Sequence, residues 1–381
     1  MTTVTRRRAA DVFVTAERRT TPIDVLFVVS VSLLLAIHLV IFVAVAVLAP
    51  VTAAEARGLE LVRLPVEVAR ALVLPFHALL LGSLFVLGRR AAGRWAGFGA
   101  MLGVLALDLR SDVVEPVYGP PTAEGGWIAA SLLAAGFALV ALPRRRVLAG
   151  VLVGAASGFF AVAALALPAF LIGIALTSPT PGDRLARGKA AATFAAAWAV
   201  PAVGMQIIWL AMLGPDGWAA RAAEFTAEFR PHAMLTWLAQ TQLLFASWHF
   251  PGLVTFSLAM FLFAAAITGV VRYFAIPQHG EHGPAVLRVL QRLPPGLWAA
   301  GLTMIFCSIW WGCSGSTLFV LPNLPILAAC VPLITALAYR GAKWLLTVNR
   351  FWALVAVVYL TGLILARTTQ LLITLVQAFH Y

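Results

Sequence analysis

Charged side chains are scarce in this sequence, and their scarcity excludes a soluble globular fold. Only 11% of the 381 residues are charged and 62% are hydrophobic, whereas soluble domains carry roughly 25% charged residues. The mean hydropathy is +0.94. A formal net charge of +12 would suggest a nucleic-acid partner in a soluble chain. Here the placement of the basic residues along the chain explains the charge better, and we expect no nucleic-acid partner.

Cysteine and the common catalytic motifs are also scarce. Cys307, Cys313 and Cys330 form no CxxC pair and no even-numbered framework, so they predict neither a metal site nor a disulfide scaffold. The sequence has no Gly-rich phosphate loop, HExxH or GxSxG motif, so we expect no nucleotide site of the soluble type. Arg18 and Arg19 precede a long apolar run without a clear small-residue cleavage site, which is typical of a permanent anchor.

Long apolar runs stand in place of these features. Residues 25–49 contain nothing more polar than Ser30, Ser32 and His38, and this length is enough to cross a hydrocarbon layer of about 30 Å. We therefore predict an all-α polytopic membrane protein, with a basic cytoplasmic tail (1–24) and a single transmembrane domain (25–381) of about eleven segments. The predicted segments are 25–49, 69–88, 94–109, 126–143, 147–160, 162–177, 191–213, 252–272, 297–312, 318–339 and 351–372.

The loops between these segments alternate between basic and acidic. Of the 27 basic residues, 20 fall in the tail and in alternate loops, and ten of the 15 acids fall in the other loops. Cytoplasmic loops carry the excess of Lys and Arg, so we predict a bacterial-type inner (plasma) membrane protein with its N-terminus in the cytoplasm and its C-terminus outside. The main outer loops are 50–68, 108–126 and 214–250.

Residues 147–177 are flanked by basic loops on both sides, Arg144 to Arg146 and Arg184 to Lys189. Both flanks should be cytoplasmic, yet 31 residues are too few for two full spans of about 20 each. We predict a folded-back pair of short helices that meet near Gly158. Irregular backbone at membrane depth must be surrounded by protein or line a cavity, so a cavity is expected there. The alternative is one long tilted helix.

The outer loops carry the candidate chemistry. Glu55 and Arg57 belong to a short charged stretch in the first loop, and the second loop contains Asp112, Glu115 and Glu124. The longest loop, 214–250, includes Trp218, Trp237 and Trp248, which is typical of amphipathic helices lying at the membrane surface.

Four segments resemble the GT-C superfamily of membrane glycosyltransferases, particularly its dolichyl-phosphate mannosyltransferase and aminoarabinose-transferase branch. They are Ala54-Glu55-Ala56-Arg57, which is similar to a first-loop Asp-Glu-Ala-Arg motif; the turn at 87–94; the basic loop followed by 150–154; and 314–322, which resembles a Ser-Lys-x-x-x-Tyr-x-Leu-Pro stretch. The chain departs from the family at three positions. Ala54 stands in place of the Asp thought to be catalytic, and Gly315 and Phe319 replace the late Lys and Tyr.

The resemblance implies transfer of a sugar from a polyprenyl-phosphate carrier to an envelope lipid, glycan or protein acceptor on the outer face. Such a reaction needs a carboxylate base and positive charge or donors at the leaving phosphate. The motif match makes Glu55 the candidate base, with a solvated interfacial charge as the alternative. Substrate-binding candidates are Arg57, Asp112, Glu115, Glu124, His249, Ser316 and Arg367. The alternatives are snorkelling to the headgroups for the two arginines, solvated loop acids for the three carboxylates and a helix cap for His249.

Cofactors stay open at this point, because the second-loop carboxylates could bind acceptor or a divalent metal. Two other functions also stay open. The missing Asp favours a catalytically inactive subunit or scaffold of a membrane complex. A transporter or an envelope polysaccharide polymerase would have a similar number of spans, but ion-coupled transporters show intramembrane charges that these segments almost entirely lack.

Overall fold

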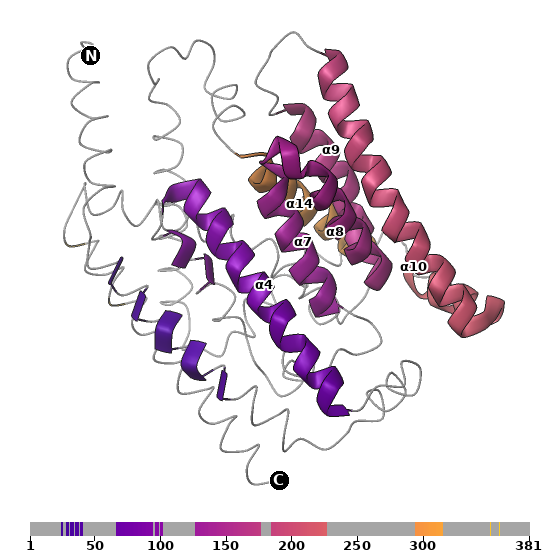
Figure 1. Cartoon of the computed structure of the whole chain (residues 1–381), viewed down its shortest axis with the longest axis horizontal. Coiled ribbons are helices and arrows are strands. Elements are labelled where there is room, and N and C mark those ends of the chain that lie inside the picture. Colours follow the sequence, from indigo (N-terminus) through magenta and orange to yellow (C-terminus); the bar gives the residue numbers. More distant parts are fainter. Residues whose placement is uncertain are drawn as a thin grey trace.

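The described part of the chain is entirely helical (Figure 1). A computed structural model describes residues 24–25, 28–29, 31–33, 35–37, 39–40, 66–93, 96–98, 100–101, 126–176, 184–226 and 294–314, together with Phe351 and Val358. Its elements are α4 (Val66–Ala92), α7 (Gly126–Val140), η1 (Pro143–Arg145), α8 (Arg146–Phe159), η2 (Ala161–Leu165), α9 (Ala166–Leu176), α10 (Arg184–Thr226) and α14 (Pro295–Ser314). Each α-helix overlaps one predicted apolar segment, and the all-α prediction is confirmed for these residues.

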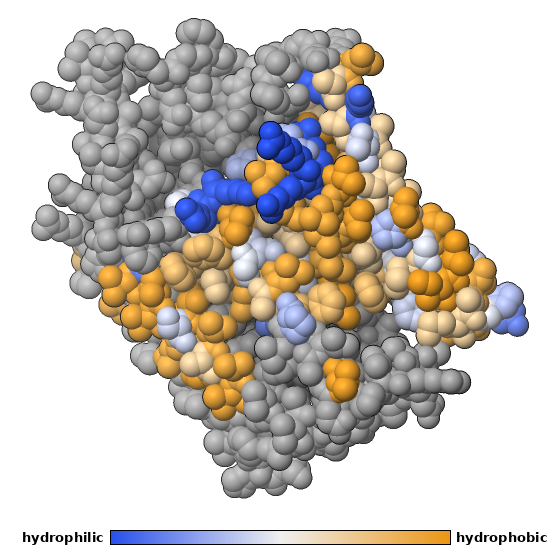
Figure 2. Space-filling view, viewed as in Figure 1, coloured by the Kyte–Doolittle hydropathy of each residue, from blue (hydrophilic) through white to orange (hydrophobic). Residues whose placement is uncertain are grey.

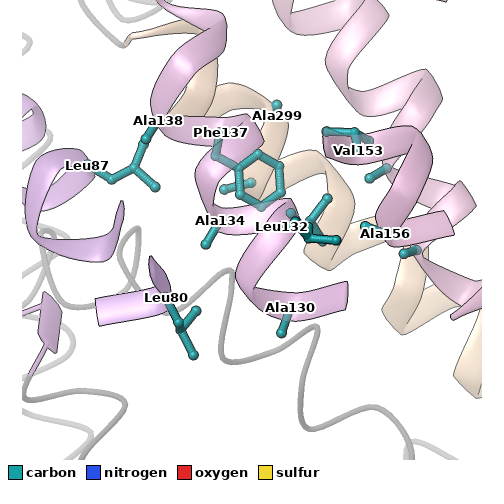
Figure 3. Close-up of a cluster of buried hydrophobic side chains, with 14 of the residues drawn as sticks. Leu80, Leu87, Ala130, Leu132, Ala134, Phe137, Ala138, Val153, Ala156 and Ala299 are labelled. Atoms are coloured by element: carbon teal, nitrogen blue, oxygen red, sulfur yellow. The ribbon is translucent and has the colours of Figure 1, made fainter. Parts of the chain in front are cut away.

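Helix α7 lies at the centre of the described helices and packs against α4, α8 and α14. Its alanines and leucines are buried on nearly every side, as Ala130, Leu133 and Phe137 illustrate. Figure 3 shows Phe137 and Leu132 of α7 between Leu87 of α4 and Val153 of α8. A helix that is apolar all round is stable only when other apolar groups surround it, so α7 forms the core around which the other helices are arranged.

Six helix termini meet at one end of this arrangement. Arg90 in the last turn of α4 donates from Nη1 to the carbonyl oxygen of Ala138 near the end of α7. A Cβ on Gly296, at the start of α14, would lie 3.3 Å from Leu87 Cδ2, and one on Gly173 of α9 would lie 3.0 Å from the Pro295 oxygen. The C-terminal ends of α4, α7 and α9 and the N-terminal ends of α8, α10 and α14 therefore share this end.

Three stacked phenylalanine rings align α9 and α10 with α7. The Phe137 and Phe170 ring centroids are 4.9 Å apart, and those of Phe170 and Phe194 are 5.0 Å apart, with both pairs nearly parallel. All three rings are fully buried. Aromatic pairs at this spacing add about 0.5–1.5 kcal/mol each beyond the area that they bury, so the column fixes the depth of α9 and α10 relative to α7.

Glycines spaced four apart bring α8 and α10 into close parallel contact. A Cβ on Gly150 would lie 2.7 Å from the Phe194 oxygen, one on Gly154 would overlap the Trp198 carbonyl, and one on Gly158 would lie 2.6 Å from Met205 Cγ. Small residues at this spacing let two helix backbones approach closely. The interface between α8 and α10 is the most extensive among the described helices.

The chain folds back between α8 and α9, and the break lies at Phe160 rather than at Gly158. Phe160 is extended (φ −140°, ψ 108°), buried, and followed by the 3₁₀ helix η2. Its N–H bonds to the Ala156 oxygen at 2.9 Å, and its own oxygen accepts from Ala163 at 3.0 Å. Gly158 is still helical and lies against Met205, and the extended residue that makes the reversal lies two residues later.

A second reversal interrupts α10 at Gly214, where the third outer loop is predicted to begin. Gly214 has φ 71° and ψ 174°, a region essentially restricted to glycine. Beyond it, Trp218 donates from Nε1 to Gln206 Oε1 at 3.1 Å. Twelve residues of straight helix would separate these side chains by about 18 Å, so the residues after Gly214 turn back along α10, as the hook in Figure 1 shows.

Charges are confined to the two ends of the described helices. The six-terminus end, which we call the basic end, carries the exposed or half-buried Arg89, Arg90, Arg144, Arg145, Arg146, Arg187 and Lys189. Figure 2 shows hydrophilic side chains gathered there. Glu67, Asp216 and Glu224 lie toward the other end, which we call the far end, together with two basic residues, Arg70 and Arg221. In α4 no charged residue stands between Arg70 and Arg89, a distance of about 28 Å.

One described helix is long and apolar enough to cross a membrane, over Leu185–Ala220 of α10. Three shorter apolar helices, Ile128–Val140, Ala161–Leu176 and Pro295–Cys307, accompany it. The outer face of α10 is exposed and apolar, with Val200 at 75% and Ile207 at 61% of their full accessibility. By length and composition alone, such a helix is weak evidence for a membrane, because buried helices of soluble proteins pass the same test.

Candidate functional site

The eight residues that the sequence predicts for the site all lie outside the described residues. They are Glu55, Arg57, Asp112, Glu115, Glu124, His249, Ser316 and Arg367. Their distances from one another, and the assignment of Glu55 as the base, therefore stay predictions. The described helices instead show which helix ends adjoin the loops that carry most of these residues.

Four helix ends that adjoin those segments share the far end. The first loop leads into Val66 of α4, the second into Gly126 of α7, the third leaves from Gly214 of α10, and Ser316 follows Ser314 of α14. The opposite ends of these four helices lie at the basic end. The charge alternation in the sequence and the direction of each described helix thus agree that these four helix ends lie opposite the basic end.

Tryptophan side chains satisfy the backbone where α8 ends. Trp209 donates from Nε1 to the Gly158 oxygen at 3.0 Å, and Trp198 donates to Ser157 Oγ at 3.0 Å. Ser157 in turn donates to the Val153 oxygen at 2.9 Å. The last carbonyls of a helix have no intrahelical partner, and in an apolar setting each needs one. Protein groups fill this role, and Met205 packs beside Gly158; the cavity that the sequence predicts there stays a prediction.

The strongest concentration of charge in the described residues is at the corner between α4 and α8. We call Arg90, Arg144, Arg145 and Arg146 the arginine corner. The corner is built on a short turn, because Pro143 opens η1, Leu142 N–H bonds to the Leu139 oxygen and Arg145 N–H bonds to the Leu142 oxygen, each at 2.9 Å. Hydrogen-bonded backbone, rather than a long loop, therefore sets where these arginines emerge.

The electrostatics of the arginine corner are unfavourable as the protein stands. Burial and the neighbouring Arg145 guanidinium lower the pKa of Arg90. Arg146 is half-buried, and its Nε has no hydrogen-bond partner. Helix α8 has no acid in its first turn and no side-chain cap, so the arginines stand at the positive end of a helix dipole, where a cation is disfavoured by about 0.3–1 kcal/mol.

Other titratable groups of the described helices form no second cluster of charge. His77 is buried in α4 and interacts with neighbouring groups. Cys307 and Cys313 are buried, free thiols in α14. In the ranges that the structure describes, no three His, Cys, Asp or Glu side chains gather where a metal ion could bind. Asp24 is fully buried and has interactions of its own.

Three features of the described site were missed by sequence reasoning. The pairing of Trp198 and Trp209 with α8 gave no signal, because tryptophan is also common at membrane surfaces. The spacing of Gly150, Gly154 and Gly158 does signal a close helix partner, but it does not name α10 as that partner. Arg90 reaching Ala138 is a tertiary contact across 48 residues.

No protein family, curated protein or solved structure matches this chain. The resemblance to the GT-C superfamily therefore depends on the four quoted segments alone.

Proposed function

We propose that the chain is an integral membrane protein whose basic end lies in the cytoplasm. The charge-free length of α4, about 28 Å, matches a hydrocarbon core of about 30 Å. The seven cationic side chains at one end fit the positive-inside rule. The exposed apolar side chains along α10 would then contact lipid instead of water.

We further propose that it is a GT-C-like glycosyltransferase, acting at the far end on a polyprenyl-phosphate sugar and a cell-envelope acceptor. The observation that carries this proposal is that α4 and α7 begin at the far end, whereas α10 reaches its break at Gly214 and α14 ends there. Their far ends adjoin the segments that hold Glu55, the second-loop acids and Ser316. The resemblance around Glu55 and Arg57 supplies the reaction.

The proposed chemistry is a single displacement at the sugar. The Glu55 carboxylate accepts the proton of the acceptor hydroxyl, and the hydroxyl oxygen forms a bond to the anomeric carbon. The bond from that carbon to the phosphate oxygen breaks, and polyprenyl phosphate leaves with the electron pair. Arg57 and Arg367 stabilise the negative charge that develops on the leaving phosphate. Asp112, Glu115 and Glu124 bind the acceptor.

Replacing Glu55 tests the reaction. Purified full-length protein is incubated with radiolabelled polyprenyl-phosphate sugars and envelope lipids, and transfer of label is measured. We expect Glu55→Gln to reduce the rate by about 10²- to 10⁴-fold, the contribution of a general base. Glu67→Gln, which removes the same charge at the start of α4, serves as the control and should retain activity. No transfer by the unaltered protein, or full activity of Glu55→Gln, would refute the enzyme proposal.

A second candidate function is a catalytically inactive GT-C-like subunit of a membrane complex. Ala54 favours it, because the family carries an Asp at the matching position and this chain does not. Mild detergent extraction distinguishes the two: a stable complex that co-purifies with the chain, together with absence of transfer, supports the subunit, whereas transfer by the isolated chain excludes it.

A further inference from the structure

The arginine corner has no role in the proposed sugar transfer, which takes place at the far end. Its four guanidinium groups come from two parts of the chain about fifty residues apart, and the contact of Arg90 with Ala138 brings them together. No carboxylate pairs with Arg90, Arg144, Arg145 or Arg146 in the described ranges. The described acids in α4 and α10 lie toward the other end.

Several features of the corner would be relieved by a bound anion. Arg90 and Arg145 repel one another, and packing removes part of the Arg90 side chain from water. The Nε of Arg146 is covered and has no acceptor. The positive end of the α8 dipole adds to the same field. Guanidinium groups bind phosphate through paired, charge-assisted hydrogen bonds, so a phosphate would satisfy donors that the protein leaves unpaired.

The position of the corner points to the source of the phosphate. It lies where the charge-free length of the helices ends, beside the exposed apolar side chains of Leu142, Val147 and Leu148. A phospholipid of the adjacent leaflet presents its phosphate at this level and its acyl chains along the helices. Basic pockets between helices on the cytoplasmic side are suited to anionic headgroups. A free phosphate ion would use the arginines but not the neighbouring apolar surface.

We propose that the arginine corner binds the phosphate of an anionic glycerophospholipid from the cytoplasmic leaflet, held between Arg90 of α4 and Arg145 and Arg146 at the start of α8. This inference rests on the proposed membrane location but not on the proposed sugar transfer. The bound lipid joins α4 to the corner between α7 and α8, and it neutralises charge that the protein itself leaves unbalanced.

Lipid retention by the purified full-length protein tests this proposal. The protein is exchanged into detergent with equimolar phosphatidylglycerol and phosphatidylcholine, and the bound lipids are counted by native mass spectrometry. We expect at least tenfold preference for phosphatidylglycerol, falling about tenfold in Arg90→Gln and in Arg145→Gln. Arg145→Lys keeps the charge but loses the planar fork and should fall between. High salt should weaken the preference, because screening reduces the attraction.

Lys189→Gln is the matched control, because it removes one positive charge from the basic end on α10, and it should keep the preference. Circular dichroism and gel filtration establish that each variant is folded. Equal retention of both lipids, or an unchanged preference in a folded Arg90→Gln, Arg145→Gln double variant, would overturn the proposal. Thermal stabilisation by inorganic phosphate equal to that by phosphatidylglycerol at the same phosphate concentration would instead identify a free-phosphate site and also overturn it.

Failure of this inference is distinguishable from failure of the proposed function. If the chain is recovered without detergent from the soluble fraction, the membrane location is wrong. If it is a membrane protein without preference for the anionic lipid, only the lipid site is wrong. Loss of sugar transfer in Glu55→Gln with unchanged lipid binding would support both proposals as separate sites.

Discussion

At the scale of single residues, the fold depends on glycines that leave no room for a side chain. A Cβ added to Gly154 of α8 would overlap the Trp198 carbonyl and would lie 2.7 Å from Pro201 Cγ. Both neighbours belong to the α10 backbone or to a rigid ring, so they cannot move aside as a flexible side chain would. The close contact between the helices therefore depends on the absence of a Cβ at this position.

We expect Gly154→Ala to separate α8 from α10 and lower the free energy of unfolding by about 1–3 kcal/mol, the usual cost of overpacking. Thermal unfolding in detergent measures the effect. The control is Gly204→Ala in α10, where a Cβ would have no neighbour within 4 Å. It should be neutral or stabilise by up to about 1 kcal/mol, because alanine favours the helix. Equal destabilisation by both variants would contradict the role assigned to Gly154.

At the scale of helices, the two reversals have different causes. At Phe160 the chain turns through an extended backbone conformation, which any amino acid can adopt. Phe160 itself is buried, so its packing contacts stabilise the turn. At Gly214 the positive φ restricts the position to glycine, so the backbone itself specifies the turn. The first reversal should therefore tolerate changes in local sequence that preserve packing, and the second should not tolerate a side chain.

Gly214→Ala should shift the residues after the break away from α10, at a cost of about 1–3 kcal/mol for a side chain in that backbone region. Cysteines replacing Gln206 and Trp218, with the three native cysteines changed to alanine, report the fold-back through a short bifunctional thiol reagent. We expect efficient cross-linking that Gly214→Ala reduces severalfold. Gly204→Ala in the same background should leave it unchanged; cross-linking that persists in Gly214→Ala would show that contacts rather than Gly214 set the turn.

At the scale of the whole molecule, the separation of charge predicts which surfaces share a compartment. Leu142 at the basic end and Ala219 beyond Gly214 are both exposed and uncharged, so cysteine at either position leaves the charge pattern intact. With a membrane-impermeant maleimide, we expect Ala219→Cys to be labelled in intact spheroplasts and Leu142→Cys only after lysis. Labelling of both from the same side would refute the proposed orientation.

Much of the helical arrangement is predictable from the sequence because apolar length and charge act locally. The run from Gly126, the basic turn at Arg144 and the need for a return before Arg184 follow from where charge interrupts hydrophobic sequence. The break at Phe160, rather than near Gly158 as predicted, does not follow from it. The eight predicted site residues remain predictions. Whether these residues form one site depends on how the outer loops pack against one another. The spacing of apolar residues along the sequence does not specify that packing.

By itself, the sequence determined that the described part of the chain is helical, where most of its helices begin and end, and that basic and acidic residues alternate between loops. The reason is that helix length and charge distribution are properties of contiguous residues. Only the tertiary structure decided that Gly150, Gly154 and Gly158 face α10, that tryptophans bond to the end of α8, and that Arg90 joins Arg145 at one corner. These contacts join residues about forty to fifty positions apart, and packing alone selects them.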